Sequence, residues 1–320
     1  MNLNGFLVVD KPAGITSHDV VAAVRACTGI KKVGHTGTLD PFATGVLPLA
    51  LGRSTRLIQF LDESIKVYDA TIRFGTSTNT GDPTGEVATT APLPEADEAD
   101  VLTVLDGFLG ERQQEPPAFS AVKVAGKPMY HYARKGEPVK AKARTIHLHA
   151  LELIDYDQQT LRIKITCSRG TYARVLADEI ALALGSAGHL EALNRDRSGP
   201  FYIEDAVGLD TIAAFVTAEE GHEWPAVLMA KRGEPRVPWR SKQDVAEALS
   251  THIRSELRSL DHLPLADVPA PDAERVRQGG HPPPPPRGVA MGDRYLVVCG
   301  ERLVAVAENS HRGPRLLRVA

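Results

Sequence analysis

The stretch Lys32-Val33-Gly34-His35-Thr36-Gly37-Thr38-Leu39-Asp40-Pro41-Phe42-Ala43-Thr44-Gly45-Val46-Leu47-Pro48 combines three glycines with two prolines. Such a segment has a strongly determined backbone and can present one side chain accurately. Asp40 is the only carboxylate in it, and Pro41 stiffens its surroundings. Two interpretations are open. Asp-Pro often starts a turn, or Asp40 is a catalytic carboxylate that acts as nucleophile or base.

A carboxylate in a site closed to water needs a cation to keep it ionised and oriented. Arg174 is the best candidate, because it falls in the first turn of a helix predicted over 172–184. The helix dipole disfavours a cation there, and a carboxylate partner would compensate. Without such a partner, Arg174 is an ordinary surface arginine.

The hydrophobic patterns predict strands at 5–10, 66–74, 144–156 and 160–167, the last two forming a hairpin. Helices are predicted from a Ser17 cap to Gly29, from a Ser54 cap to 61, and over 96–108 and 172–184, with a loop at 31–48. The order lacks regular alternation of strand and helix, which favours an α+β fold.

The 320 residues exceed what one ordinary domain needs. A five-proline run at 282–286 precedes three short predicted strands, at 295–299, 303–307 and 315–319. We therefore expect a catalytic domain over 1–262 and a small β-rich domain over 263–320. The segment 218–252 is mostly polar with helical stretches, and it suggests no chemistry.

The formal net charge is −3, which argues mildly against a nucleic-acid ligand. The charge is unevenly distributed, however. Residues 81–110 hold seven acidic residues and no Lys or Arg, whereas residues 111–144 hold eight basic and three acidic residues, a local charge of +5. Because salt screens charges beyond about 8–10 Å, a local basic stripe can bind phosphate despite the total. The alternative is a solvated charged face.

Three cysteines, Cys27, Cys167 and Cys299, are far apart and fit neither a disulfide framework nor a metal-ligand spacing. A reducing, cytoplasmic setting and no metal or other cofactor are therefore expected. The short apolar run 6–9 lacks the preceding positive region of a signal peptide. No apolar stretch approaches the roughly 20 residues that span a bilayer, so no membrane association is expected.

The chain resembles the TruB family of tRNA pseudouridine synthases. The segment Gly34–Pro41 with Ala43-Thr44-Gly45 is similar to the family's catalytic motif. Further similar segments follow in order: Lys11–Ser17, Lys66-Val67-Tyr68, Gly81–Gly85, Gln114–Lys123, Tyr130–Gly136, Ser168–Arg174 and Gly188–Arg195. The resemblance runs from residue 5 to about 210, and it is weaker in the C-terminal region, where it points to a PUA-like domain.

The resemblance implies catalytic roles for Asp40, Tyr68 and Arg174, and substrate contacts for His35, Tyr172, Leu193, Lys11, Asp82, Lys123 and Arg134. Asp40 would act at the ribose of an everted uridine and pair with Arg174. Tyr68 would stack on the uracil and is a candidate for proton abstraction at C5. The alternative interpretation is that Tyr68 is an aromatic residue of the strand whose ring packs inward beside Ile72 and Phe74. His35 would brace the T loop, or it is simply a satisfied loop histidine.

The resemblance also implies a mixed, mainly antiparallel central sheet flanked by helices and loops, with an RNA-binding insertion at about 111–147. The expected reaction is isomerisation of uridine 55 in the T arm of tRNA by a monomer, without guide RNA. Two departures stand out. Phe119 stands where the family often has tyrosine, and Asn194 where a basic residue is common.

Three other interpretations compete with this one. The nearest is a guide-RNA-dependent synthase of the related archaeal and eukaryotic type, which the 111–144 stretch and the lack of Lys-rich tails disfavour. A second is a non-catalytic RNA-binding or tRNA-folding protein. A third is a glycosidase, which normally needs two carboxylates, with Asp82 as the second. Gly81-Asp82-Pro83 is first of all typical of a turn.

Overall fold

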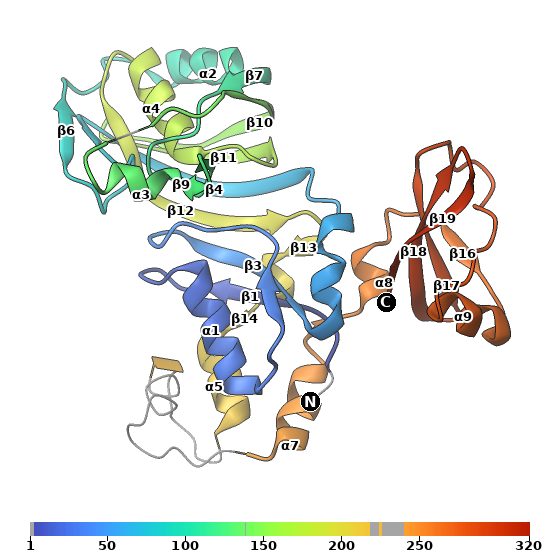
Figure 1. The fold of residues 1–320 in the computed structure, drawn as a ribbon. Helices are drawn as coiled ribbons and strands as arrows, with labels where there is room; N and C mark the ends of the chain where they lie inside the picture. Colours follow the sequence, from blue (N-terminus) through green and yellow to red (C-terminus); the bar gives the residue numbers. More distant parts are fainter. Residues whose placement is uncertain (1–2, 138, 218–223, 226–239) are drawn as a thin grey trace.

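The computed structural model describes residues 3–137, 139–217, 224–225 and 240–320. A large twisted sheet forms the body of the molecule (Figure 1). Its main path runs in the order β14 (Val207–Gly208), β1 (Gly5–Lys11), β3 (Thr44–Leu51), β12 (Gly188–Ser198), β4 (Ile65–Phe74), β11 (Thr160–Ser168), β10 (Arg144–Tyr156) and β7 (Gly110–Gln114). Three short strands join at its margins: β2 (Val33–His35), β13 (Phe201–Tyr202) and β15 (Ile253–Arg254).

Most neighbours in this sheet are antiparallel, including the predicted β10–β11 hairpin. Among its described strands, the parallel pairs are β1 with β14 and β3 with β12. The predicted α+β fold with a mixed, mainly antiparallel sheet is confirmed. The central β3–β12–β4 triplet matters most for the site, because it brings the Asp40 loop and Tyr68 to one place.

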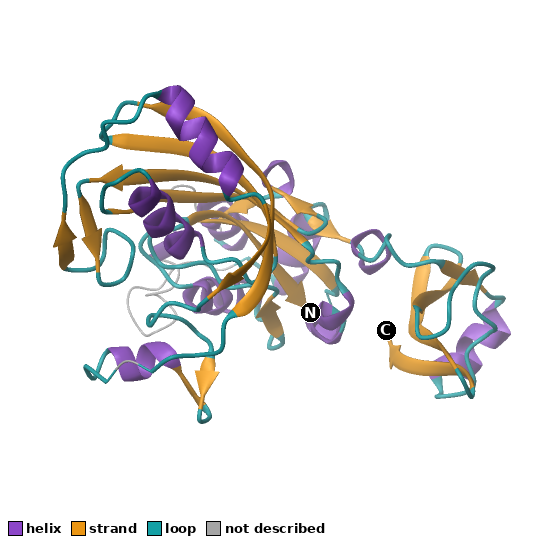
Figure 2. Ribbon diagram, turned by 90° about the horizontal axis from the view of Figure 1, so that it is seen from above, coloured by secondary structure: helices purple, strands orange, loops and turns teal. Residues whose placement is uncertain are grey.

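Two groups of helices pack against the sheet (Figures 1 and 2). One group comprises α1 (Ser17–Thr28), α5 (Leu209–Val216) and α7 (Lys242–Ser250), and the other comprises α2 (Glu98–Gly107) and α4 (Ala173–Ala183). A single continuous apolar core lies beneath both groups. None of the helices described here has the length and apolar character needed to cross a membrane.

The alternation of side chains along β1 explains how the sheet buries both of its faces. Leu7 and Val9 point into the main core, whereas Phe6 and Val8 point into a second core on the other side. That second core also takes residues from the C-terminal region. The run of apolar residues predicted as a buried strand is therefore buried on both faces, as such runs usually are.

A four-stranded sheet forms the C-terminal region, in the order β16 (Leu265–Asp267), β17 (Arg294–Cys299), β18 (Arg302–Ser310) and β19 (Gly313–Val319), with α9 (Ala270–Arg277) packed on it. The three strands predicted here are confirmed. The short helix α8 (Glu256–Ser259) leads into this region, and the Arg294 guanidinium lies over the Phe60 ring, 5.3 Å from its centroid.

Two predicted helix caps were wrong. Thr16, not Ser17, caps α1, because its hydroxyl accepts from the Asp19 amide and Asp19 caps back in return. The predicted helix from Ser54 is instead two short 3₁₀ turns, η1 (Gly52–Arg56) and η2 (Ile58–Phe60). The Ser54 hydroxyl accepts from the Gly5 amide at 2.6 Å and so ties this turn to β1.

The loops also differ in extent from the prediction. The loop predicted at 31–48 is shorter, because β2 and β3 take both of its ends. The basic insertion leaves the sheet only after β7 and returns at β10, so the first and last residues predicted for it, 111–114 and 144–147, are strands. Between them lie β8 (Lys123–Val124), β9 (Lys127–Pro128) and α3 (Met129–Ala133). Of the segment 218–252, residues 218–223 and 226–239 lie outside the described residues.

Smaller elements complete the chain. Strands β5 (Thr76–Thr78) and β6 (Val87–Thr90) form a hairpin, and η3 (Ile203–Asp205) follows β13. Below, the name "excursion" denotes residues 115–143 apart from residue 138.

Gly45 is required where β3 begins. Its φ is +97°, and a Cβ atom built on it would lie 2.4 Å from the Arg195 carbonyl oxygen of β12. Both the backbone conformation and the close strand contact exclude a side chain. Gly170 has a similar φ of +87°, but no atom lies within 4 Å of such a Cβ. An alanine at residue 170 would therefore cost only the backbone strain of a positive φ, without a steric clash.

We predict that Gly45→Ala lowers the free energy of unfolding by about 3 kcal/mol, because backbone strain and a steric clash with β12 add together. Gly170→Ala should cost only about 1–2 kcal/mol, from strain alone. Urea unfolding of both variants measures the difference. Equal losses would show that the β3–β12 contact places no steric demand on residue 45.

Candidate functional site

The Arg174 guanidinium lies at the centre of the site. It projects from the first turn of α4, as predicted, and its side chain is only 5% exposed. Its Nε lies 2.8 Å from Asp40 Oδ2, and its Nη2 lies 3.4 Å from Asp40 Oδ1. The Asp40 side chain stays 34% exposed, so the ion pair is anchored on the arginine side and open on the carboxylate side.

The same guanidinium contacts two other segments of the chain, the turn at 80–82 and the backbone at Phe119. Its Nη1 donates to the Thr80 carbonyl at 2.6 Å, and its Nη2 donates to the Phe119 carbonyl at 2.9 Å. Asp82 Oδ2 lies 3.9 Å from Nη1. Because the contact at Phe119 is through its backbone, the departure from tyrosine at this position leaves that hydrogen bond intact.

Asp82 is buried, and it organises the loop that faces Arg174. Its Oδ1 accepts from the Thr80 hydroxyl at 2.8 Å, from the Thr84 amide at 2.9 Å and from the Thr84 hydroxyl at 2.5 Å. The structure thus brings Asp82 together with Asp40 and Arg174. Three donors already occupy one oxygen, and the other faces the guanidinium.

Burial raises the pKa of Asp40 above its ordinary value, while the charge of Arg174 acts in the opposite direction. The negative charge of Asp82 raises the pKa of Asp40 further. The arginine and the second carboxylate therefore set how readily Asp40 ionises. A carboxyl group whose pKa is shifted by burial and by specific charged neighbours is typical of a functional site.

Lys11 is fully buried, and its ammonium holds the loop that carries Asp40. Its Nζ donates to the carbonyls of Pro41 at 3.2 Å and Ala43 at 2.6 Å, and to its own neighbour Pro12 at 2.8 Å. Burial lowers the pKa of Lys11 to about 8. The sequence predicted that Lys11 contacts substrate, whereas these three acceptors assign its ammonium to the backbone of the loop.

Ser17 fixes the residue before Asp40. Its hydroxyl donates to the Leu39 carbonyl at 3.0 Å and accepts from the Leu39 amide at 2.8 Å. One side chain thus satisfies both backbone groups of Leu39, as a neighbouring β-strand would. The Gly14 amide donates to the Pro41 carbonyl at 2.8 Å. The rigidity predicted from glycines and prolines thus also depends on partners distant in the chain.

Tyr68 lies on β4 and pairs with Arg195 of β12 and Ile165 of β11. Its ring packs partly against the main core, so the inward-packing interpretation holds for part of the side chain. Burial raises the pKa of Tyr68, the Arg195 charge opposes this, and the Asp40 charge raises it further. Strand β12 lies between β4, which carries Tyr68, and β3, which follows the Asp40 loop.

Two other predicted residues flank Tyr68 and Arg174. Leu193 is buried on β12 and pairs with Ala70 of β4. Tyr172 is half-buried and immediately precedes α4, and its backbone is clamped by the Gln114 amide: the Tyr172 N–H donates to Oε1 at 2.7 Å, and Nε2 donates to the Tyr172 carbonyl at 3.2 Å.

His35 ends β2 and pairs with Leu49 of β3. Its Nδ1 and the Thr36 hydroxyl oxygen are both buried, and neither forms a hydrogen bond within the part of the chain that is described. Burial and the nearby charges of His18 and Arg195 lower the pKa of His35, which favours a neutral ring at pH 7. Buried polar atoms are nearly always hydrogen-bonded, so these two neighbouring atoms are an exception to the packing of the site.

Lys123 and Arg134 lie in the excursion and are not brought into contact with Asp40. Lys123 is exposed on β8, and Arg134 directly follows α3, where its guanidinium lies 5.5 Å from the Tyr130 ring centroid. The excursion reaches the centre of the site through the Phe119 carbonyl.

Asn194, the other departure, has an internal role. Its side-chain oxygen accepts from the Thr44 hydroxyl and its Nδ2 donates to Asp196, both at 2.7 Å, which ties β12 to β3.

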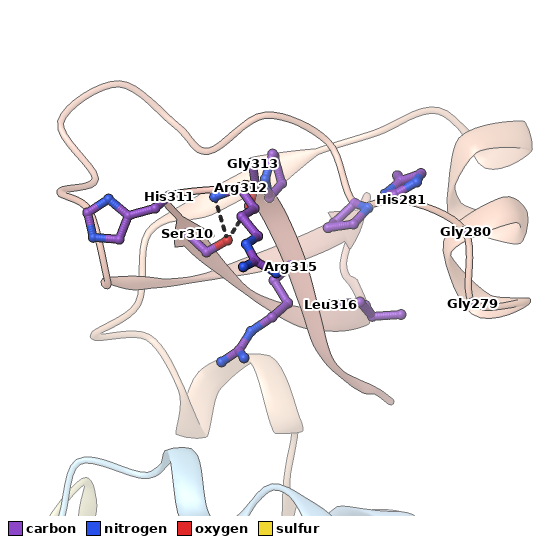
Figure 3. A pocket seen from close by; sticks show the side chains of 11 residues that line it. Gly279, Gly280, His281, Ser310, His311, Arg312, Gly313, Arg315 and Leu316 are labelled. Atoms are coloured by element: carbon purple, nitrogen blue, oxygen red, sulfur yellow. Dashed lines mark hydrogen bonds between the residues drawn. The ribbon is translucent and has the colours of Figure 1, made fainter.

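A separate cavity of about 580 Å³ lies in the C-terminal region, between the end of α9 and the β18–β19 turn (Figure 3). Its lining includes four side chains that carry or can carry positive charge, His281, His311, Arg312 and Arg315. Arg315 also pairs with Glu308 at 3.0 Å. The cavity is therefore basic on balance.

Sequence reasoning assigned no role to two buried residues of this site. Gln114 is the first residue of the segment Gln114–Lys123, which resembles a family motif. Its two hydrogen bonds to the Tyr172 backbone form because the end of β7 lies beside the start of α4. Arg195 is buried on β12 and donates hydrogen bonds to the loop before Asp40. Its strand also contains Glu191, Asn194, Asp196 and Arg197, so no local pattern marks Arg195 as the buried member, and its charge alone suggests a surface residue.

The chain matches known proteins along its whole length. The model of the TruB family pseudouridylate synthase N-terminal domain matches residues 25–173. A tRNA pseudouridine synthase B from Geobacter sulfurreducens is 38% identical, with 99% of each chain covered. The chain belongs to the TruB family.

Other members and structures agree with this membership. The tRNA pseudouridine synthase B of Geotalea uraniireducens is 49% identical over 65% of this chain and 67% of its own. Among solved structures, one chain of a Cbf5-Nop10-Gar1 complex superposes with a TM-score of 0.68 at 25% identity, covering 98% of this chain and 84% of that one. TruB proteins are isomerases, so the glycosidase interpretation is set aside.

We predict that Asp82→Asn moves the acid limb of the pH–rate profile to lower pH. The amide keeps an oxygen for the three donors but removes a negative charge that raises the pKa of Asp40. An acid limb set by the ionisation of Asp40 would move to lower pH together with this pKa. Rates of pseudouridine formation measured across the acidic range test this, with the exposed Asp261→Asn as control. An unmoved limb would remove Asp82 from the electrostatics of Asp40.

Proposed function

We propose that this TruB protein converts uridine 55 in the T loop of tRNA into pseudouridine. The observation that carries the proposal is the Asp40–Arg174 ion pair, held from the arginine side by a buried guanidinium and open on the carboxylate side. A relative that matches over the full chain is named as a tRNA pseudouridine synthase, which supports tRNA as the substrate class.

The reaction moves one bond of a single nucleotide. The target uridine leaves the stacked T loop, at a cost of a few kcal/mol that contacts with the protein offset. Asp40, ionised, acts at the ribose as the C1′–N1 bond breaks. The uracil then turns, C5 bonds to C1′, the C5 proton is removed, and N1, which has lost its bond to the ribose, takes up a proton. The product has the same atoms as the substrate, so neither a redox cofactor nor net hydrolysis is needed.

The residues around Asp40 bind the uracil, line its pocket or hold the loops that frame it. Tyr68 holds the detached uracil by stacking and is our candidate for accepting the C5 proton. Tyr172 and Leu193 line the base pocket. His35, neutral and with a buried unpartnered Nδ1, occupies space in the T loop and offers it a polar contact. Lys11 and Asp82 hold the loops that frame the pocket.

RNA binding beyond the pocket is assigned to two basic surfaces. The excursion, with Lys123 and Arg134, contacts the phosphates of the T arm. The C-terminal region, 263–320, acts as a PUA-like RNA-binding unit whose basic cavity accepts another part of the RNA. The excursion favours a stand-alone monomer over a guide-RNA-dependent enzyme. Three free cysteines fit a cytoplasmic location.

Asp40→Asn should abolish pseudouridine formation while leaving tRNA affinity within about threefold of wild type, since a neutral amide cannot supply the reacting carboxylate. Incubation with an unmodified tRNA transcript, followed by chemical mapping of pseudouridine, measures reaction and position together. Turnover near the wild-type rate, or pseudouridine at another position, would refute the proposal.

Replacing Lys123, Lys127 and Arg134 together by Gln should weaken tRNA binding and flatten its dependence on salt. Each lost phosphate contact removes about 0.9 from the slope of log K against log salt for duplex nucleic acid. Filter-binding titrations at several salt concentrations measure this slope. A triple replacement of Arg73, Arg162 and Arg258 by Gln, outside both proposed RNA-binding surfaces, is the control and should leave the slope unchanged. A slope that the excursion variant also leaves unchanged would mean that this stripe faces solvent.

A further inference from the structure

Arg195 lies on β12 at the point where three central strands meet. It pairs with Gly45 of β3 on one side and with Tyr68 of β4 on the other. The residue is only 1% exposed, although it is an arginine in a sheet next to the active site. Its strand therefore links the Asp40 loop with the strand that carries Tyr68.

The guanidinium of Arg195 donates to three carbonyls on the two sides of Asp40. Nη2 reaches the Gly37 carbonyl at 3.2 Å and Nη1 the Thr38 carbonyl at 3.4 Å, both before Asp40. Nε reaches the Val46 carbonyl at 2.8 Å, after Asp40. One side chain thus spans the residues 37–46 that contain the reacting carboxylate.

The charge of Arg195 has no carboxylate partner within 4 Å among the residues described. A buried cation without a carboxylate is costly unless its donors are satisfied by other dipoles. The three carbonyls supply these dipoles. Their directions match the planar, fixed donors of a guanidinium, whereas a lysine ammonium carries its donors on one atom and cannot reach all three. The three hydrogen bonds compensate the buried charge, and they also fix the loop to which the carbonyls belong.

We propose that Arg195 is a positioning residue that holds the Asp40 loop against the Tyr68 strand, so that carboxylate and ring meet the same everted nucleotide. This rests on the proposed function of Asp40. Arg195 is assigned no contact with the ribose or the uracil, because all three of its nitrogens donate to the backbone. It acts through the placement of Asp40 and Tyr68, and its charge also acts on the Tyr68 hydroxyl.

The test compares Arg195→Lys with Arg197→Lys. Arg197 lies two residues further along β12, donates to the Gly199 carbonyl at 2.8 Å and stacks on Tyr202, and it makes no hydrogen bond to the Asp40 loop as described. We expect Arg195→Lys to lower the single-turnover rate about 100-fold, since misplacing a reacting group by about 1 Å can cost that much. Its tRNA Kd should stay within about threefold of wild type, and Arg197→Lys should keep its rate.

A second variant separates positioning from general stability. Arg195→Ala removes the side chain, and added ethylguanidinium should restore part of its rate by filling the same three-carbonyl site. The same additive should do nothing for Asp40→Asn. A wild-type rate in Arg195→Lys, or a loss of tRNA affinity as large as the loss of rate with no rescue of Arg195→Ala, would overturn the proposal. If Asp40→Asn is itself active, the proposed function fails instead.

Discussion

The site depends on the need to neutralise one buried guanidinium. Arg174 is nearly inaccessible to water, so its charge and its donors must be met by protein. The groups that meet them come from distant segments: the Asp40 loop, the 80–82 turn and the excursion at Phe119. The Arg174 guanidinium therefore holds the Asp40 loop, the 80–82 turn and the excursion together around the Asp40 carboxylate.

This arrangement fixes the position of the Asp40 carboxylate and leaves it partly exposed. Burial disfavours the charged form of Asp40, and the arginine favours it, so the carboxylate remains ionisable without being inert. Around it, Lys11 and Ser17 fix the backbone through hydrogen bonds that restrict the loop on both sides of Asp40. The result is an acid whose position is set by the backbone and whose charge is set by its neighbours.

The sequence predicted the parts of this site that local pattern can reveal. The motif around Asp40, the strand with Tyr68 and the placement of Arg174 in the first turn of its helix can be read from neighbouring residues. It could not reveal that Lys11 binds carbonyls of the loop, or that Ser17 pairs with Leu39 instead of capping a helix, because both follow from contacts between residues more than 20 positions apart. Arg195 was missed for the same reason: a buried arginine and a surface arginine look alike in a sequence.

The same distinction holds for the fold. Strands with clear alternation, such as β4 and β10, were predicted closely, whereas β2 and β3 were hidden inside a segment rich in glycine and proline. Thr16 competed with Ser17 for the cap of α1, and adjacent hydroxyl residues give no local reason to choose. Tertiary contacts decided each of these cases.

The second core has a consequence for how the two regions of the chain can be separated. Phe6 and Val8 of the first strand share that core with Leu260, Leu296 and Val306, and α8 bridges them. The C-terminal sheet is thus fused to the back of the enzyme by an apolar seam. A truncation that ends the chain near residue 262 would uncover that seam, so the shortened protein would tend to self-associate, and any loss of RNA contacts would be confounded with it.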